Sequence, residues 1–274
     1  MKKFKSLMLA AAMIGLSSVT SYAVTNPPEL INIRFGGGVD NILPFSGPAI
    51  VGSTGDYWNP VIATALLPAN VGQGATAVKY ADNALSSVTF AYTADLNVNG
   101  AAGVSGFGGG PYAELMRNYI STSDGTTVNA YDTLDFAGLV GGKSYKIWVY
   151  TQTADVEING WGDNQKLHID FRNELDTSTI ASWETSAYSN GGASKFIVNQ
   201  NYLTGDIVAN GDGSIHMRYS SPLNSSVLSE NTGAINGVQI ATPEPASMLL
   251  IGVGGALMSA MKARKKKSAE KSIV

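Results

Sequence analysis

Two short alternating runs hold both histidines of the chain, and with them the residue types that serve in acid–base chemistry. His168, Asp170 and Arg172 alternate with apolar residues in one run, and His216 and Arg218 do so in the other. Side chains alternate between the two faces of a β-strand, so each run predicts a strand with its polar residues outward. If the two strands are neighbours, these residues share one face and form a polar ligand-binding or acid–base cluster. The alternative is an ordinary solvated sheet face.

Tryptophans beside amides and carboxylates predict a carbohydrate-binding site. Exposed aromatic rings stack on sugar faces, and neighbouring polar groups hydrogen-bond to the hydroxyls. Two segments have this composition: Trp58 with Asn59, and Trp161 with Asp163 and Asn164. These five residues are the candidate ligand-binding residues. The alternative for each tryptophan is a place in the core or over the edge of the fold.

The sequence predicts no metal centre, no cofactor and no catalytic residue. Zinc sites draw three or four ligands from histidine, cysteine and carboxylate, and this chain has two histidines and no cysteine. The Asn-Gly-Asp-Gly-Ser segment at 210–214 offers oxygens to a structural calcium ion, but it also fits a turn. No Gly-x-Ser-x-Gly nucleophile elbow occurs. Scattered carboxylates leave glycoside hydrolysis open, because that reaction needs only two of them across the sugar.

The middle of the chain is acidic although the whole chain has a net charge of only −3. Residues 24–242 keep nine basic and 19 acidic residues, which gives them a net charge of −10. Such a domain repels phosphate backbones, so nucleic acid is not an expected partner.

Short apolar–polar alternations predict an all-β fold for residues 24–241. They recur at 30–35, 87–93, 145–150, 167–172 and 215–219. The turn at 210–213 is expected to close a hairpin between the flanking strands. One helix is predicted over 112–120, with Pro111 in its first turn. Many short strands with a single helix favour a two-sheet antiparallel sandwich of jelly-roll type.

The first 23 residues are predicted to be a signal peptide. Three lysines precede an apolar stretch over 7–16, and Ser21-Tyr22-Ala23 follows as a small-x-small exit. The stretch is too short for a permanent span, which needs about 20 apolar residues. We therefore expect cleavage after Ala23 by signal peptidase; the alternative is an uncleaved anchor.

The C-terminal part carries three signals in a fixed order. Pro243, Glu244 and Pro245 precede an uncharged apolar segment over 246–261 that is predicted to span the membrane. A basic membrane stop follows, made of Lys262, Arg264, Lys265, Lys266 and Lys267. Basic clusters stay in the cytoplasm, so everything upstream is expected outside the inner membrane.

This order resembles the PEP-CTERM sorting signal of Gram-negative bacteria over residues 242–267. The resemblance implies that an exosortase, a membrane-embedded transpeptidase-like enzyme, processes the chain, and such proteins often accompany exopolysaccharide production. Here a tail over 268–274 follows the basic stop, where many members end.

The middle also resembles jelly-roll, galactose-binding-like domains of exported bacterial proteins. The resemblance is carried by Gly-Asp-Tyr-Trp-Asn at 55–59, the 134–139 segment before the strand at 145–150, and the closing run at 236–240.

Together these observations predict a surface or extracellular-matrix protein without enzymatic activity. It is inner-membrane anchored during sorting, then located at the cell surface or outside, and it binds exopolysaccharide through its sandwich. The alternative is a secreted carbohydrate-active enzyme, a glycoside hydrolase or lyase, on the same scaffold.

The position of the mature N-terminus tests the predicted topology. We expect the exported protein to begin at Val24, because signal peptidase cuts after the small residue that closes the exit motif. Intact-mass and N-terminal peptide analysis of the exported protein measure this directly. A mature product that begins at Met1 would contradict the prediction.

Overall fold

The computed structural model describes residues 29–37, 47, 49–63, 71–94, 96–98, 112–116, 118–122, 131–152, 166–185, 195–220 and 233–241. The chain divides into two compact units, Met1–Thr242 and Pro243–Val274, and all described residues belong to the first. The predicted signal peptide, membrane span and basic stop lie outside the described residues. Within the described ranges, no helix is long and apolar enough to cross a membrane.

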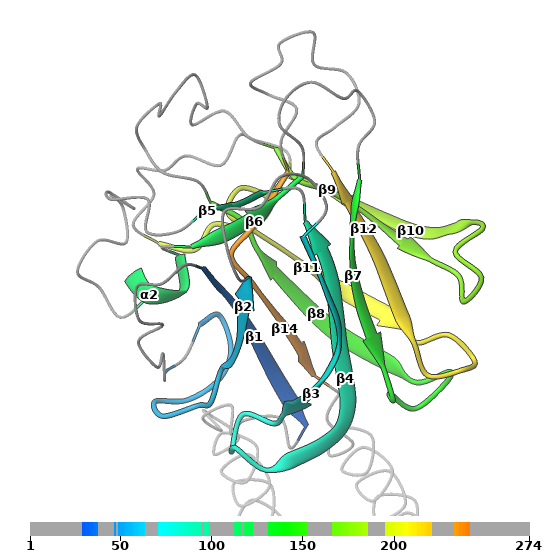
Figure 1. The fold of residues 1–274 in the computed structure, drawn as a ribbon, viewed down its shortest axis with the longest axis horizontal. Coiled ribbons are helices and arrows are strands. Elements are labelled where there is room, and N and C mark those ends of the chain that lie inside the picture. Colours follow the sequence, from blue (N-terminus) through cyan, green and yellow to red (C-terminus); the bar gives the residue numbers. More distant parts are fainter. Residues whose placement is uncertain are drawn as a thin grey trace, which may run out of the picture. The chain divides into compact units, whose positions relative to one another are not determined.

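One sheet contains both the first and the last strand of the domain (Figure 1). Its five strands run in the order β11 (Tyr202–Val208), β8 (Ser144–Tyr150), β14 (Gly237–Ala241), β1 (Leu30–Gly37) and β2 (Asn59–Ala63). Neighbours are antiparallel except β1 and β2, which are parallel. Leu30 lies opposite Ala241. The chain therefore enters β1 and leaves β14 at the same end of the sheet.

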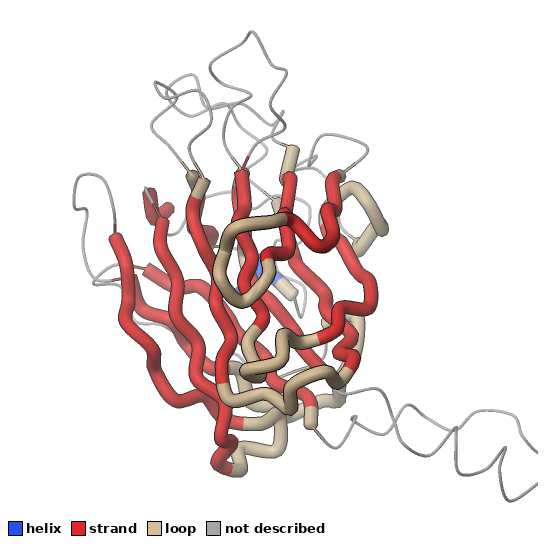
Figure 2. Tube along the Cα trace, turned by 90° about the vertical axis from the view of Figure 1, so that its right-hand side faces the viewer, coloured by secondary structure: helices blue, strands red, loops and turns tan. Residues whose placement is uncertain are grey.

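The second sheet has six strands, and all its pairings are antiparallel. Their order is β10 (Thr179–Glu184), β9 (His168–Arg172), β12 (Ile215–Ser220), β7 (Asp132–Ala137), β4 (Leu85–Ala94) and β3 (Val71–Lys79). Figure 2 shows how strongly strands dominate the described part. The predicted all-β, two-sheet sandwich of jelly-roll type is confirmed.

A small third sheet replaces part of the predicted helix. It consists of β13 (Ala234–Ile235), β6 (Tyr119–Ser121) and β5 (Leu96–Val98). The helix α2 covers only Ala113–Met116, so the prediction of a helix through residue 120 is wrong. Residues 119–121 pair on both sides with β5 and β13, and these tertiary pairings override the local helical periodicity.

The turn at 210–213 joins the two sheets and does not close a hairpin. β11 before it pairs with β8, whereas β12 after it pairs with β7 and β9. The amide of Gly213 donates to the carbonyl of Asn210 at 2.9 Å. The expected hairpin is therefore wrong, because the turn residues specify a tight reversal but not which strands pair across it.

The main core lies between the two large sheets. Inward residues of β1, β14 and β8 meet inward residues of β4, β7, β9 and β12 in one apolar cluster. Aromatic rings gather at one part of this cluster: Phe90 lies 4.9 Å from Phe136 and 6.1 Å from Phe35, centroid to centroid. Burial of large apolar side chains provides the main stabilisation of such a domain, at roughly 25 cal/mol per Å² of apolar surface.

A second apolar layer covers the other face of the five-stranded sheet. Its buried residues are Leu30, Ala49, Trp58, Ala81, Leu115, Met116, Trp148, Tyr150 and Ala241. All five residues of β14 are consequently buried. Alternation shows where a strand lies but not whether further chain covers its polar side.

Buried amide side chains hold this second layer to the sheet. Tyr150 Oη donates to Gln239 Oε1, and Gln239 Nε2 donates to Asn32 Oδ1 at 2.7 Å and to the carbonyl of Val51 at 3.2 Å. Gln239 and Asn32 are both fully buried. Buried polar groups are costly unless they are hydrogen-bonded, so this network links β1, β8, β14 and the segment around Val51.

Replacing Gln239 by leucine should destabilise the domain strongly. The change keeps a similar volume but leaves Tyr150 Oη and Asn32 Oδ1 without this partner, and each unsatisfied buried group costs about 1–3 kcal/mol. We expect the free energy of unfolding to fall by about 2–4 kcal/mol, measured by urea denaturation. Gln200→Leu in the partly exposed 197–201 turn is the control and should have little effect. Equal stabilities for both variants would contradict the role of the network.

Candidate ligand-binding face

The outer surface of the six-stranded sheet gathers the polar residues singled out in the sequence. β9 and β12 are neighbours, with Arg172 opposite His216 and Asp170 opposite Arg218. Their apolar residues point into the main core. His168, Asp170, Arg172, His216 and Arg218 therefore share one face, as the alternation predicted under the condition that the strands are neighbours.

Residues of β10 and β7 extend this surface, which we call the polar face. It consists of Ser182, Glu184, His168, Asp170, Arg172, His216, Arg218, Ser220, Thr133 and Asp135 on the strands, with Tyr131 and Asp176 beside them.

Asp176 ties the two arginines of the polar face together. Arg172 Nε donates to Asp176 Oδ1 at 3.0 Å, and its Nη2 donates to the Asp176 carbonyl at 3.0 Å. Arg218 Nη2 donates to the other carboxylate oxygen. Burial raises the pKa of Asp176, but the hydrogen bonds from Arg218 and Arg172 outweigh it and bring the pKa below its usual 3.8. The carboxylate thus holds two guanidinium groups in place on adjacent strands.

Tyr131 adds an aromatic ring to this cluster. The guanidinium carbon of Arg218 lies 4.0 Å from the centroid of the Tyr131 ring, a cation–π contact. The tyrosine is 49% exposed, so much of its surface remains open to solvent. Arg218 is therefore held between a carboxylate and an accessible aromatic ring.

Both histidines lie beside carboxylates on the same face. His168 Nδ1 lies 3.2 Å from Glu184 Oε2, and its Nε2 lies 3.3 Å from Asp170 Oδ1. His216 Nδ1 lies 2.8 Å from Asp135 Oδ1. Nitrogen groups and carboxylate oxygens thus lie side by side on four strands. A ligand rich in hydroxyl groups, each both donor and acceptor, matches such a surface.

Two of the five predicted ligand-binding residues lie inside the fold. Trp58 is 3% exposed, and its indole N–H donates to the carbonyl of Gly47 at 2.9 Å. Asn59 is 7% exposed; its amide donates to the carbonyls of Asn32 and Lys79. The expectation that these two side chains are exposed is therefore wrong, because Trp58 packs in the second apolar layer and the amide of Asn59 is used in hydrogen bonds to the backbone. Trp161, Asp163 and Asn164 lie outside the described residues.

The 210–214 segment uses its carboxylate within the turn. Asp212 Oδ1 accepts from the amide of Ser214 at 2.9 Å and from its hydroxyl at 2.6 Å. The hydrogen bond from the Ser214 side chain is the largest influence on the pKa of Asp212 and lowers it. The described residues contain no group of three or more histidine, cysteine or carboxylate side chains that could hold a metal ion. The structural calcium ion at this turn stays a prediction.

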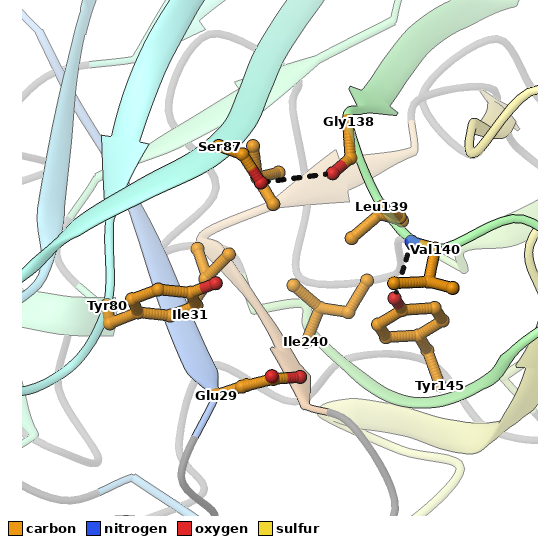
Figure 3. Close-up of a pocket in the computed structure, with 10 residues that line it drawn as sticks. Glu29, Ile31, Tyr80, Ser87, Gly138, Leu139, Val140, Tyr145 and Ile240 are labelled. Carbon is orange, nitrogen blue, oxygen red and sulfur yellow. Dashed lines mark hydrogen bonds between the residues drawn. The ribbon is translucent and has the colours of Figure 1, made fainter.

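A pocket of about 170 Å³ lies at one end of the sandwich (Figure 3). Ile31, Val88, Leu139 and Ile240 provide apolar lining, and Glu29, Tyr80, Ser87, Gly138, Val140 and Tyr145 complete it. Several polar groups are already engaged: the amide of Val140 donates to Tyr145 Oη at 2.9 Å, and Ser87 Oγ donates to the carbonyl of Gly138 at 3.3 Å. It is smaller than typical ligand pockets of roughly 300–1,000 Å³.

Tyr131 and Asp176 were not predicted as site residues. A spacing of two residues relates Tyr131 to Thr133 and Asp135. A strand predicted at 132–137 would therefore have placed Tyr131 on the same face as these two residues. Asp176 reaches its partners from the connection between β9 and β10. Its partner Arg218 lies on β12, outside the β9–β10 hairpin. No local sequence pattern predicts a contact of this kind.

A β-sandwich domain followed by a C-terminal sorting signal defines an exported, sorted protein. Residues 241–267 match the PEP-CTERM protein-sorting motif, which confirms the resemblance seen in the sequence. The chain is thus an exported protein that carries the recognition signal of exosortase.

Comparison of the fold with solved structures finds distant similarities. The ANXUR2 extracellular domain from Arabidopsis thaliana shares 13% identity at a TM-score of 0.41, over 79% of this chain and 52% of that chain. A family 35 carbohydrate binding module from Clostridium thermocellum shares 10% identity at a TM-score of 0.27, over 46% of this chain and 88% of that chain. The chain spans about half the length of the plant domain. No curated protein matches the sequence.

Removing the charge of Asp176 should weaken the sandwich in a pH-dependent way. The pKa of Asp176 is lowered in the folded state, so its stabilisation is present above the ordinary pKa of 3.8 that the group has in the unfolded chain, and it is lost as the pH falls through the folded value. We expect Asp176→Asn to lower the free energy of unfolding at pH 7 by up to about 1 kcal/mol, as for half-exposed ion pairs.

Urea denaturation at several pH values measures this effect. The gap between Asp176→Asn and the unmodified protein should close as the pH falls below about 4. Asp206→Asn is the control, because Asp206 is 62% exposed and its pair with Lys146 spans 3.7 Å. A gap that stays constant down to pH 2 would contradict the ionic role of Asp176.

Proposed function

We propose that this protein is a surface or extracellular-matrix component that binds a neutral polysaccharide on the polar face. The observation that carries the proposal is the arrangement around Arg218, where a fixed guanidinium lies against the half-exposed ring of Tyr131. An aromatic ring offers a stacking surface for a sugar, and neighbouring charged groups offer strong hydrogen bonds to its hydroxyls.

The fixed geometry of the polar face supports binding of an extended ligand. Asp176 fixes Arg172 and Arg218, and ring nitrogens of His168 lie beside two carboxylates. Side chains that are already ordered lose less conformational entropy when a ligand binds. A sheet surface also extends over several strands, which suits a polymer better than the small pocket at the end of the sandwich.

The charge of the domain favours a neutral polymer over an acidic one. The exported region has a net charge of −10, and the polar face holds four carboxylates against two guanidinium groups. A polyanion would meet repulsion from the whole domain. A neutral polysaccharide meets donors and acceptors without this long-range cost.

Alanine at position 131 should weaken polysaccharide binding. Loss of the ring removes the stacking surface, and we expect the dissociation constant to rise about 5- to 10-fold, equivalent to about 1–1.4 kcal/mol. Affinity electrophoresis in gels that contain neutral or acidic polysaccharides measures the change. Tyr57→Ala is the matched control, because Lys79 Nζ lies 5.3 Å from the ring of Tyr57, away from the polar face.

The same experiment separates binding from catalysis. A retarded protein that releases no reducing ends supports a binding role, whereas release that stops on substitution of a single carboxylate supports the alternative of a carbohydrate-active enzyme. Equal retardation of Tyr131→Ala and the unmodified protein would contradict the polar face as the binding site.

A further inference from the structure

The pocket at the end of the sandwich lies between the two large sheets (Figure 3). Ile31 of β1, Ile240 of β14 and Tyr145 of β8 line it from the five-stranded sheet, and Val88 of β4 lines it from the six-stranded sheet. Leu139, in the connection between β7 and β8, completes its apolar lining. These side chains belong to the main core or pack against it. The pocket therefore has an apolar floor provided by both sheets.

Hydrogen bonds hold the β7–β8 connection in place as one wall of the pocket. The amide of Val140 donates to Tyr145 Oη at 2.9 Å, and the amide of Leu139 donates to the carbonyl of Gly213 at 3.0 Å. The wall is thus fixed to β8 and to the turn that precedes β12. A pocket with fixed walls loses little conformational entropy when it takes up a ligand.

The size and lining of the pocket select a small apolar body. An apolar cavity of about 150 Å³ holds one benzene molecule, and this pocket measures about 170 Å³. The side chains of Ile31, Val88, Leu139 and Ile240 offer no hydrogen bond to a hydroxyl group. A sugar ring would lose its bound water here without replacement, which is costly. The pocket therefore fits a single hydrocarbon ring better than a sugar.

Two polar side chains reach the pocket from its rim. Figure 3 shows the carboxylate of Glu29 and the hydroxyl of Tyr80 beside the apolar lining. Burial raises the pKa of Tyr80, and the nearby charge of Glu29 raises it further. The phenol therefore stays protonated at neutral pH, and Glu29 supplies negative charge at the pocket.

The present partner of Glu29 holds it only weakly. Lys143 Nζ lies 3.5 Å from Glu29 Oε2, and the side chain of Glu29 is 46% exposed. Exposed ion pairs of this kind contribute little to stability. An ammonium group that enters the pocket can thus replace Lys143 beside the carboxylate at small cost.

The charge of the domain acts in the same direction as Glu29. The exported region has a net charge of −10, which attracts cations and repels anions over a long range. A ligand with an apolar body and a positive head group therefore matches both the pocket and the field around it.

We propose that this pocket is a second ligand-binding site, which takes a small organic ammonium ion with an apolar body about the size of benzene. The body lies against Ile31, Val88, Leu139 and Ile240, and the ammonium group faces Glu29. The site goes beyond the proposed polysaccharide binding and is independent of it. The pocket lies between the sheets, whereas the polar face is the outer surface of the six-stranded sheet.

The first test titrates three probes with the same ring into the exported protein: benzylammonium, benzyl alcohol and benzoate. Nuclear magnetic resonance of isotope-labelled methyl groups should show benzylammonium binding most tightly and benzoate least tightly. The methyl signals of Ile31, Val88 and Leu139 should shift. The proposal would be overturned by equal affinities for the three probes, by shifts confined to other methyl groups, or by no saturable binding of benzylammonium with a dissociation constant below about 10 mM.

The second test removes the carboxylate at the rim. Glu29→Gln should weaken benzylammonium binding about 3- to 5-fold and leave benzyl alcohol binding unchanged. Asp206→Asn is the matched control, because it removes one negative charge that also pairs with a lysine, Lys146, at 3.7 Å. The control should change the affinity less than about 2-fold. Equal losses in both variants would overturn the proposal, since the net charge of the domain alone would then explain the binding.

The third test fills the pocket from its wall. Leu139→Trp places a larger side chain in the space and should abolish the binding of both benzylammonium and benzyl alcohol. A urea unfolding curve establishes that the variant is folded, and Glu29→Gln decides the question if it is not. Undiminished binding to folded Leu139→Trp would contradict the assignment of this pocket.

Discussion

The pairing of the first strand with the last is the constraint on which the domain depends. β1 and β14 are separated by some two hundred residues, yet they lie side by side near the centre of the five-stranded sheet. Their inward residues form part of the main core, and their outward residues anchor the second layer. The entropic cost of closing a loop rises by only about 0.6 kcal/mol for each doubling of its length. The long separation in sequence between β1 and β14 therefore adds little to the free-energy cost of pairing them. Neither apolar layer is complete until the final strand has joined.

This closure leaves the two sheets with different outer surfaces. The five-stranded sheet is covered by the segment around Trp58, by α2 and by aromatic residues near Tyr150. The six-stranded sheet carries the polar face on its outside and apolar residues inside. A ligand that recognises strand side chains in the described part of the domain therefore meets the six-stranded sheet. The two outer surfaces differ because connecting segments cover the five-stranded sheet, and not because the strands themselves differ.

Local patterns in the sequence anticipated the strands but not their surroundings. The period of two placed His168, Asp170 and Arg172 on one face, because alternation is a property of each strand alone. The burial of Trp58 depends on the Gly47 carbonyl and on a second layer assembled from distant segments, and no local pattern encodes these contacts. The turn at Asn210 was recognisable, but its partner strands depend on the topology of the whole sandwich. The sorting motif was readable because its signals are contiguous.

The ion pairs of the polar face serve two purposes that do not conflict. A surface pair such as Arg218 with Asp176 contributes little to stability on its own, since water screens it. Its larger effect is to fix the rotamers of long side chains that would otherwise sample many conformations, at a cost of up to about 2 kcal/mol each when ordered. A domain without disulfides has to order its surface through such contacts and through its core. The same contacts keep the Arg218 side chain fixed beside the ring of Tyr131, and the proposed binding of a neutral polysaccharide rests on this prior order, because ordered side chains lose less conformational entropy when a ligand binds.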